Sequence, residues 1–93
     1  MINSNEYFDG NVKSLGYTSA EGKSSIGVME PGEYKFDTST HETMVVIQGE
    51  LVVQLPNTSE WKSFKTGEQF EVDGNTSFLV KISAQSSYLC KYK

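Results

Sequence analysis

The sequence predicts an all-β fold, a single jelly-roll barrel that spans residues 1–93. Short runs rich in β-branched and aromatic residues alternate with turn residues at nearly regular intervals, which is typical of sandwiches and barrels. Two glycine-led blocks, which begin at Gly32 and Gly67, have similar patterns, as the two Greek-key halves of a jelly roll would. We find no segment with the periodicity of a helix.

The first half of the chain supplies four expected strands. Ile26–Met29 ends at a Pro-Gly pair, and Tyr34–Thr38 alternates apolar and polar side chains, so that one of its faces points inward. The run Thr43–Ile47 is continuous and largely β-branched, which predicts a strand buried on both faces. Gln48–Glu50 then turns the chain into Leu51–Leu55.

The second half supplies four more expected strands. Trp61–Lys65 and Gln69–Val72 flank the turn at Gly67, and Ser77–Ile82 and Ser87–Tyr92 complete the fold. Residues 5–14 are expected to add an edge strand or to pack against the barrel.

Tyr7 and Phe8 are large apolar side chains in that otherwise polar N-terminal stretch. We expect them to cover the core or to form a dimer contact rather than to bind substrate. Exposed strand edges need covering, and cyclic dimers are the commonest oligomers, so we expect a homodimer.

The composition limits the classes of partner and compartment. A chain of 93 residues builds one modest core, which predicts one domain. The formal charge of −4 disfavours binding to a long nucleic acid, and the absence of arginine removes the bidentate clamp for phosphate. The N-terminus has no signal-peptide pattern, no run is apolar enough to span a membrane, and the single Cys90 fits a reducing compartment. We therefore expect a cytoplasmic protein that does not bind membranes.

The spacing of glycine and glutamate in both blocks resembles that of cupins, small β-barrels that usually hold a divalent metal. Metal-binding cupins carry a His-x-His pair ahead of the glutamate and a further histidine in the second motif. When the chain is aligned on Glu42 and Gly49, those positions fall near Phe36, Thr38 and Phe78. The resemblance therefore implies a barrel with neither a metal site nor a metal cofactor.

A closer resemblance, to the pyrimidine/purine nucleoside phosphorylase family of short, metal-free cupins, covers nearly the whole chain. The segments that carry it are Asn5–Phe8, Gly27–Met29, Gly32–Phe36, Glu42–Met44, Gly49, Leu55–Pro56, Trp61 and Ser87–Tyr92. The resemblance implies a pentosyltransferase, a glycosyltransferase that uses inorganic phosphate to convert purine and pyrimidine nucleosides to free base and α-D-ribose 1-phosphate. One departure is Lys91, where family members tend to have arginine. Lysine keeps the positive charge but cannot donate the two parallel hydrogen bonds of a guanidinium group.

Glu42 is the candidate catalytic residue, because the cupin alignment points it into the barrel. There its charge would stabilise a cationic ribose or bind the ribose hydroxyls. A carboxylate hydrogen-bonded to strand ends is the alternative. Thr38, at a former ligand position, would bind phosphate or ribose, unless its hydroxyl is satisfied by a neighbouring strand.

The remaining candidates for substrate binding are Tyr34, Phe36, Tyr88 and Lys91. Tyr34 and Phe36 share the face of Thr38 and would stack on a base, or simply fill the core. Tyr88 and Cys90 share one face of the last strand and Lys91 lies on the other. Cys90 is expected to be a small buried residue rather than a nucleophile, and His41 to lie in a solvated loop.

Two other classes of function stay open from the residues alone. A non-catalytic barrel that binds a sugar or a nucleotide would use Glu42 and the aromatic residues equally well. A metal-dependent enzyme is disfavoured, because the histidine ligands are missing.

Overall fold

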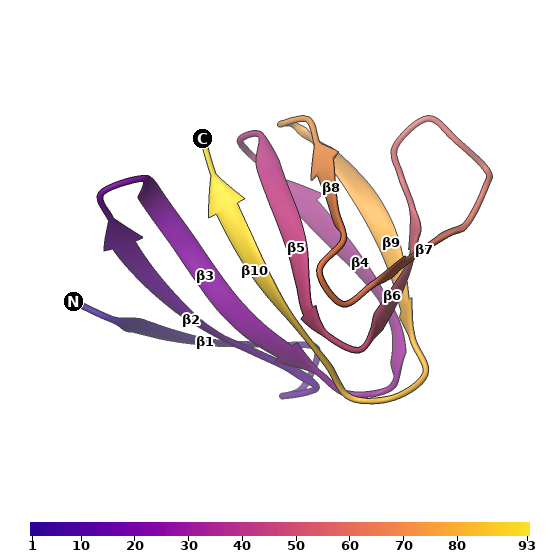
Figure 1. Ribbon diagram of the computed structural model, residues 1–93, viewed down its shortest axis with the longest axis horizontal. Helices are drawn as coiled ribbons and strands as arrows, with labels where there is room; N and C mark the ends of the chain where they lie inside the picture. Colours follow the sequence, from indigo (N-terminus) through magenta and orange to yellow (C-terminus); the bar gives the residue numbers. More distant parts are fainter.

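In the computed structural model, which describes residues 1–93, ten strands form two antiparallel sheets (Figure 1). The larger sheet has the order β1 (Asn3–Tyr7), β2 (Val12–Ser19), β3 (Gly22–Met29), β10 (Ser86–Tyr92), β5 (Glu42–Gln48) and β8 (Gln69–Val72). The smaller sheet has the order β4 (Gly32–Thr38), β9 (Thr76–Ile82), β6 (Glu50–Gln54) and β7 (Lys62–Lys65). The predicted all-β class is confirmed.

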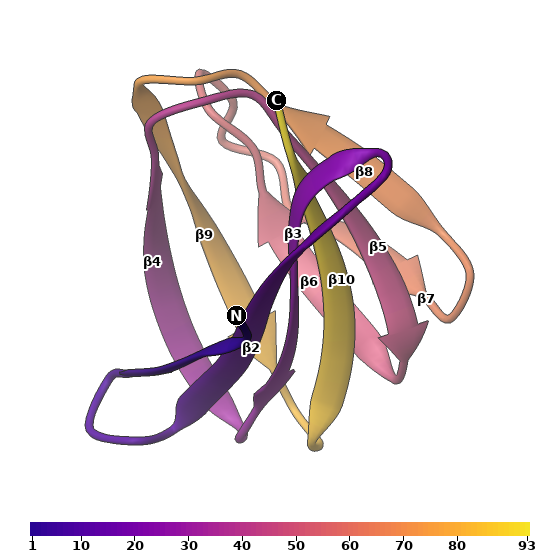
Figure 2. The same cartoon turned by 90° about the vertical axis from the view of Figure 1, so that its left-hand side faces the viewer.

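Strands β3 to β10 have the connectivity of a jelly roll, because the chain passes from one sheet to the other after every strand except β6. No ladder of hydrogen bonds joins the two sheets, so the barrel is open. The larger sheet extends beyond the smaller one through β1 and β2, which lie nearest the viewer in Figure 2. One part of its inner face is therefore left without a facing sheet.

The N-terminal segment forms two strands around a tight turn at residues 8–11. The amides of Gly10 and Asn11 donate to the carbonyls of Tyr7 and Phe8, both at 3.1 Å. The expected edge strand is present as β1, which pairs with β2 in register from Asn3 to Tyr7. The extent of β2 was not predicted, because its polar, glycine-containing sequence lacks clear alternation.

The core lies between the sheets and consists of 14 buried apolar side chains. Alternation places Met44 and Val46 of β5 in this core, whereas Val45 is half-buried and Ile47 is 43% exposed. The prediction that Thr43–Ile47 is buried on both faces is therefore wrong. The physical reason is that β5 lies in the larger sheet, only one face of which is covered.

Gly27 of β3 lies directly opposite Tyr88 of β10. A Cβ atom at position 27 would overlap the Tyr88 ring. The missing side chain therefore lets Tyr88 lie flat across the inner face of the sheet.

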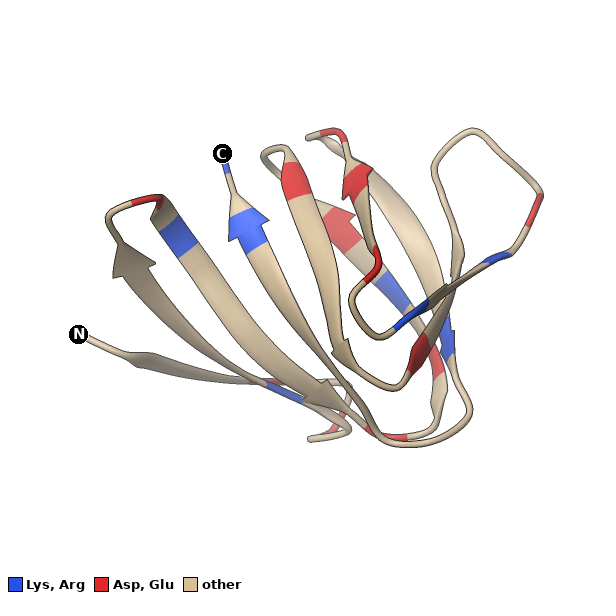
Figure 3. Cartoon of the chain, viewed as in Figure 1, with Lys and Arg blue, Asp and Glu red and all other residues tan.

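Basic residues are scattered over strands of both sheets and do not gather on one element (Figure 3). This distribution offers no continuous basic stripe of the kind that follows a nucleic-acid backbone. No helix with the length and apolar composition needed to span a membrane is present.

Candidate active site

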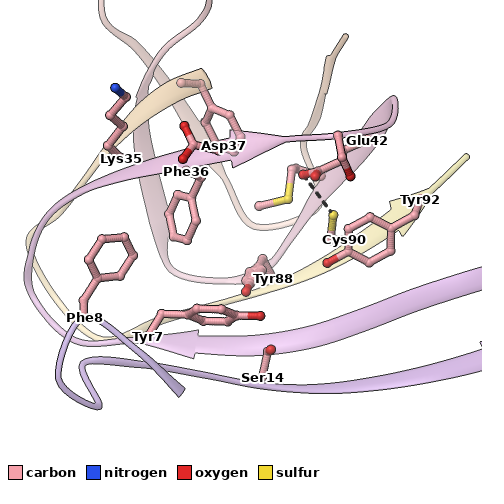
Figure 4. A pocket seen from close by; sticks show the side chains of 13 residues that line it. Tyr7, Phe8, Ser14, Lys35, Phe36, Asp37, Glu42, Tyr88, Cys90 and Tyr92 are labelled. Atoms are coloured by element: carbon pink, nitrogen blue, oxygen red, sulfur yellow. Dashed lines mark hydrogen bonds between the residues drawn. The ribbon is translucent and has the colours of Figure 1, made fainter. Parts of the chain in front are cut away.

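A pocket of about 520 Å³ lies on the inner face of the larger sheet, between β10, β5, β4 and the N-terminal turn (Figure 4). Its size is within the range of roughly 300–1,000 Å³ typical of small-molecule sites. Six aromatic residues line it: Tyr7, Phe8, Phe36, Phe78, Tyr88 and Tyr92. The polar residues among its lining include Ser14, Lys35, Asp37, Ser39 and Glu42.

Glu42 begins β5 and lines this pocket, as the cupin alignment predicts. Its side chain accepts a hydrogen bond from the Cys90 thiol, with 3.4 Å between Sγ and Oε1. Burial raises the pKa of the Glu42 carboxyl, and the Cys90 hydrogen bond and the charge of His41 oppose the rise. A partly desolvated carboxylate beside a cavity interacts strongly with any positive charge that develops there.

The other titratable groups around Glu42 are neutral hydrogen-bonding groups. Burial raises the pKa of the Cys90 thiol, so it acts as a donor to Glu42 and not as a thiolate nucleophile. The expectation that Cys90 is a small buried residue is confirmed. Burial likewise raises the pKa values of the Tyr88 and Tyr92 hydroxyls, which stay protonated.

Phe36 is the centre of an aromatic wall on the opposite side of the pocket from Glu42 (Figure 4). Its ring stacks on that of Phe78 at 5.6 Å, and the Phe8 ring meets it edge-on at 5.5 Å. Phe36 is only partly buried, so it both packs and faces the cavity. Phe8 adopts a positive φ of 53°, which is uncommon for a non-glycine residue and aims its ring over the pocket from the turn.

Tyr34 does not line the pocket. Its hydroxyl donates to the Glu30 carbonyl at 2.6 Å, which holds the ring deep in the barrel. The ring lies 5.0 Å from that of Phe8 and supports it from behind. Of the two alternatives for Tyr34, the structure favours core packing.

Thr38 and Lys91 also lie away from the pocket. The Thr38 hydroxyl donates to the Asp73 carbonyl at 2.7 Å and accepts from the Thr76 amide at 3.1 Å, so a neighbouring strand satisfies it. Lys91 points to the outer face of β10 and pairs with Glu21 at 3.6 Å. Its replacement of arginine therefore changes the surface and not the pocket.

The residues at the cupin metal positions do not fit a metal ion. The Phe36 and Phe78 rings have no donor atoms, and the Thr38 oxygen is already bonded to the backbone. No group of three His, Cys, Asp or Glu side chains is arranged to hold a metal.

His41 lies at the surface rather than in the pocket. Its Nε2 is 2.8 Å from Oε1 of Glu71, and its Nδ1 is 3.8 Å from Asp73. The hydrogen bond and charge from His41 lower the pKa of Glu71. The expected loop position is correct, but the ring is tied to the end of β8 and is not free in solvent.

Sequence reasoning missed Tyr92 and Ser14 as pocket residues and gave Tyr7 and Phe8 other roles. The alternation Tyr88-x-Cys90-x-Tyr92 was a signal that places Tyr92 on the inner face. Ser14 had no such signal, since the edge segment expected over residues 5–14 has no clear alternation to show which of its side chains face inward.

The comparisons with known proteins cover the full chain. The family model for pyrimidine/purine nucleoside phosphorylase matches residues 2–92. A protein of that name from Psychromonas ingrahamii is 54% identical over 90 residues, which cover 97% of this chain and 96% of the relative. Another, from Tolumonas auensis, is 50% identical over 93 residues and all of both chains.

Solved structures agree with this relationship. A protein of unknown function from Vibrio parahaemolyticus has a TM-score of 0.96 and 43% identity, over 100% of this chain and 99% of its own. The CENP-C cupin domain of Drosophila melanogaster, at 15% identity, has a TM-score of 0.73 over 99% of this chain and 75% of its own. The second likeness confirms the cupin fold alone. The match over residues 2–92 shows that the chain belongs to the pyrimidine/purine nucleoside phosphorylase family.

Proposed function

We propose that this chain is a broad-specificity nucleoside phosphorylase, a pentosyltransferase that acts as a homodimer in the cytoplasm. The observation that carries the proposal is the half-buried Glu42 carboxylate facing an aromatic wall across one pocket. The names of relatives that are 50–54% identical support the same reaction. The single free cysteine, Cys90, fits a reducing compartment.

The reaction exchanges one bond to the ribose C1′ atom for another. A phosphate oxygen forms the new bond to C1′, and the electrons of the C1′–N bond leave with the base. The proton carried by hydrogen phosphate ends on the base nitrogen, so atoms and charges balance. Formation of an α product from a β-nucleoside requires attack on the face of the ribose opposite the base.

Glu42 is proposed to stabilise the ribose as positive charge develops on it. A carboxylate fixed beside that charge in a partly desolvated site stabilises the transition state more than the ground state. Tyr88, as a protonated phenol on the same inner face, is suited to donate a hydrogen bond to a ribose oxygen.

The aromatic wall accounts for broad base tolerance. Phe8 and Phe36 offer ring surfaces, and base–aromatic stacking depends little on base identity, because every base has a π face. We therefore propose that purine and pyrimidine nucleosides share this side of the pocket.

Phosphate dependence tests the proposed function. Purified protein is incubated with uridine and with adenosine, with and without phosphate, and free base is measured by chromatography. We expect base to be released only when phosphate is present. Binding of nucleosides without any cleavage would instead support the rival function, a non-catalytic sugar- or nucleotide-binding barrel.

We predict that turnover does not require a metal ion. The basis is the set of non-ligating residues at the cupin metal positions, Phe36, Thr38 and Phe78. Protein treated with EDTA and desalted is expected to keep its full rate of base release. Loss of activity that one divalent metal restores contradicts this prediction.

A stripe of apolar side chains on the outer face of the larger sheet supports the proposed homodimer. Leu15, Ile26, Leu89 and Val45 lie opposite one another across β2, β3, β10 and β5. Leu15 is 52% exposed and Ile26 is 42% exposed in the single chain. A contiguous exposed apolar patch of this kind marks an interaction site. The N-terminal aromatic residues Tyr7 and Phe8 line the pocket and are still 47% and 41% exposed in the single chain, so a dimer contact through them stays a prediction.

Light scattering at micromolar concentration is expected to give twice the mass of the 10.4 kDa chain. Ile26→Lys places a charge at the centre of the stripe and is expected to yield a folded monomer, whereas Ser83→Lys, in an exposed turn, leaves the mass unchanged. A wild-type monomer, or a dimer that survives Ile26→Lys, counts against this interface.

A further inference from the structure

A second cavity, of about 200 Å³, lies beside the active-site pocket on the uncovered part of the larger sheet. The two cavities share Tyr7, Ser14 and Tyr92, so they are adjacent. Most of the second lining consists of polar side chains from β1, β2 and β3. The roles proposed for Glu42 and the aromatic wall leave this cavity without a function.

The inner face of the larger sheet changes from apolar side chains at one edge to polar side chains at the other. Along one row of paired residues, Phe70 and Met44 are followed by Cys90, then Ser25, then Gly16 and Asn3. The apolar end of the row lies under the smaller sheet, and the polar end lies beyond it. The second cavity occupies this polar end.

Ser14 offers a free hydroxyl to a ligand in this cavity. The residue is only 6% exposed, it lines both cavities, and its hydroxyl has no hydrogen-bond partner in the protein. Nearby, the Ser25 and Tyr92 hydroxyls are 2.8 Å apart and share one hydrogen bond, which leaves donor capacity on that pair. No buried side-chain polar atom lacks a hydrogen-bond partner, so the Ser14 hydroxyl is open to the cavities and free to donate to a polar ligand there.

Lys23 gives the cavity its charge. It is the only basic residue in the lining and forms no ion pair, whereas Lys13 and Lys91 pair with Glu6 and Glu21. The active-site pocket has one basic residue, Lys35, and it shares the lining with Asp37 and Glu42. A dianion is therefore better accommodated in the second cavity.

We propose that inorganic phosphate binds in this second cavity, held by the Ser14 hydroxyl, by the one free O–H of the Ser25–Tyr92 pair and by the Lys23 ammonium group. The inference rests on the proposed function and names its phosphate subsite. Lysine and hydroxyl donors suit phosphate in a chain that has no arginine.

The position fits the stereochemistry of the reaction. Figure 4 shows Phe8 and Phe36 on one side of the pocket, with Tyr92 and Glu42 on the other and Ser14 below. A base stacked on the phenylalanines places the ribose beside Tyr88 and Glu42. Phosphate held by Ser14 and Tyr92 then approaches C1′ from the side away from the base, as the α product requires.

The test compares two variants with two matched controls. Ser14→Ala removes the unpaired hydroxyl and Lys23→Gln removes the charge, while Ser83→Ala and Lys65→Gln make the same changes at exposed positions outside both cavities. KM is measured separately for phosphate and for uridine, with thermal melting on each sample.

Ser14→Ala is expected to raise the KM for phosphate roughly 10- to 100-fold, because one hydrogen bond to a charged group is lost. The KM for uridine and the controls should stay close to wild type. Lys23→Gln, at an exposed site, is expected to have a smaller effect on the KM for phosphate and to weaken its dependence on salt. An unchanged KM for phosphate in both variants, with wild-type turnover intact, overturns the subsite.

Two binding measurements test the subsite independently of turnover. Calorimetric titration of the protein with inorganic phosphate alone reports on the subsite even if no phosphorolysis occurs. Binding that Ser14→Ala weakens supports the subsite, and absence of binding by the wild type contradicts it. Titration with uridine 5′-monophosphate identifies the other source of a phosphate group. If Ser14→Ala weakens only that binding, the cavity holds a nucleotide phosphate and the proposal is wrong.

Discussion

Glu42→Gln is expected to lower kcat for uridine phosphorolysis roughly 10²- to 10³-fold, by analogy with removal of one preorganised stabilising group. Glutamine keeps the size of the side chain and can still accept the Cys90 hydrogen bond, but it has no charge to set against the cationic ribose. The rate is measured at saturating uridine and phosphate. Near wild-type turnover in a normally melting variant excludes Glu42 as a catalytic residue and makes Tyr88 and Tyr92 the next to test.

The same variant is expected to melt at a temperature equal to or above that of wild type at neutral pH. The pKa of Glu42 is raised in the folded protein, so the folded state binds its proton more tightly than the unfolded state does. The contribution of Glu42 to stability therefore falls as the pH rises from its ordinary value of 4.5 through the raised one. Melting curves across this range should converge at acid pH, where the wild-type carboxyl is protonated. A large loss of stability at neutral pH identifies a structural role instead.

Gly27→Ala is the second substitution with a large expected effect. The new methyl group overlaps the end of the Tyr88 ring, and the ring can avoid it only by shifting into the pocket that it lines. Overpacking of this kind costs about 1–3 kcal/mol and pushes the ring toward the pocket. We expect a melting temperature lower by roughly 4–8 °C for each kcal/mol, and a large loss of kcat/KM.

Two variants control for this effect. Gly16→Ala, on the neighbouring strand, places its Cβ at ordinary contact distances of 3.9 Å or more and should leave the melting temperature almost unchanged. The double substitution Gly27→Ala with Tyr88→Leu makes room for the methyl group and should recover stability but not activity. Recovery of both shows that Tyr88 has no part in the reaction.

The alternation of apolar and polar residues, together with glycines at the turns, was sufficient to predict the strands of the jelly roll. Both patterns depend only on the local backbone conformation. Gly49 and Gly67 adopt positive φ values of 102° and 87° at turns, as their positions indicate. Alternation also predicted that Phe36 and Tyr88 face inward, and both line the pocket.

The same rule failed at Tyr34 and Thr38 for a definite reason. A period of two gives the face of a strand on which a side chain lies, but not its position along the barrel or its hydrogen-bond partner. Both residues do face inward, yet the Glu30 carbonyl and the β9 backbone take up their hydroxyls. The Thr38 partners lie 35 and 38 residues away in the chain, so one sequence does not reveal them. The Glu30 carbonyl is only four residues from Tyr34, but alternation does not report that the turn between them directs it at the hydroxyl.

The part of the site built from β2 was beyond sequence reasoning. Ser14 is only 6% exposed although the stretch around it is polar, so its burial has no signal in the local sequence. Likewise, the burial of only one face of β5 follows from which sheet it joins, a choice made by long-range pairing with β10 and β8.

The N-terminal turn supplies Tyr7 and Phe8 to the pocket from outside the eight strands of the jelly roll. The carboxylate and the Phe8 ring that faces it across the pocket are thus encoded by separate parts of the chain. Residues 3–11 contribute no side chain to the buried core, so they can be substituted at little cost in stability while Glu42 and β5 stay unchanged. Changes in this turn would therefore alter which substrates bind without changing the residues around Glu42. Exchanging the turn between relatives is a direct way to alter substrate preference.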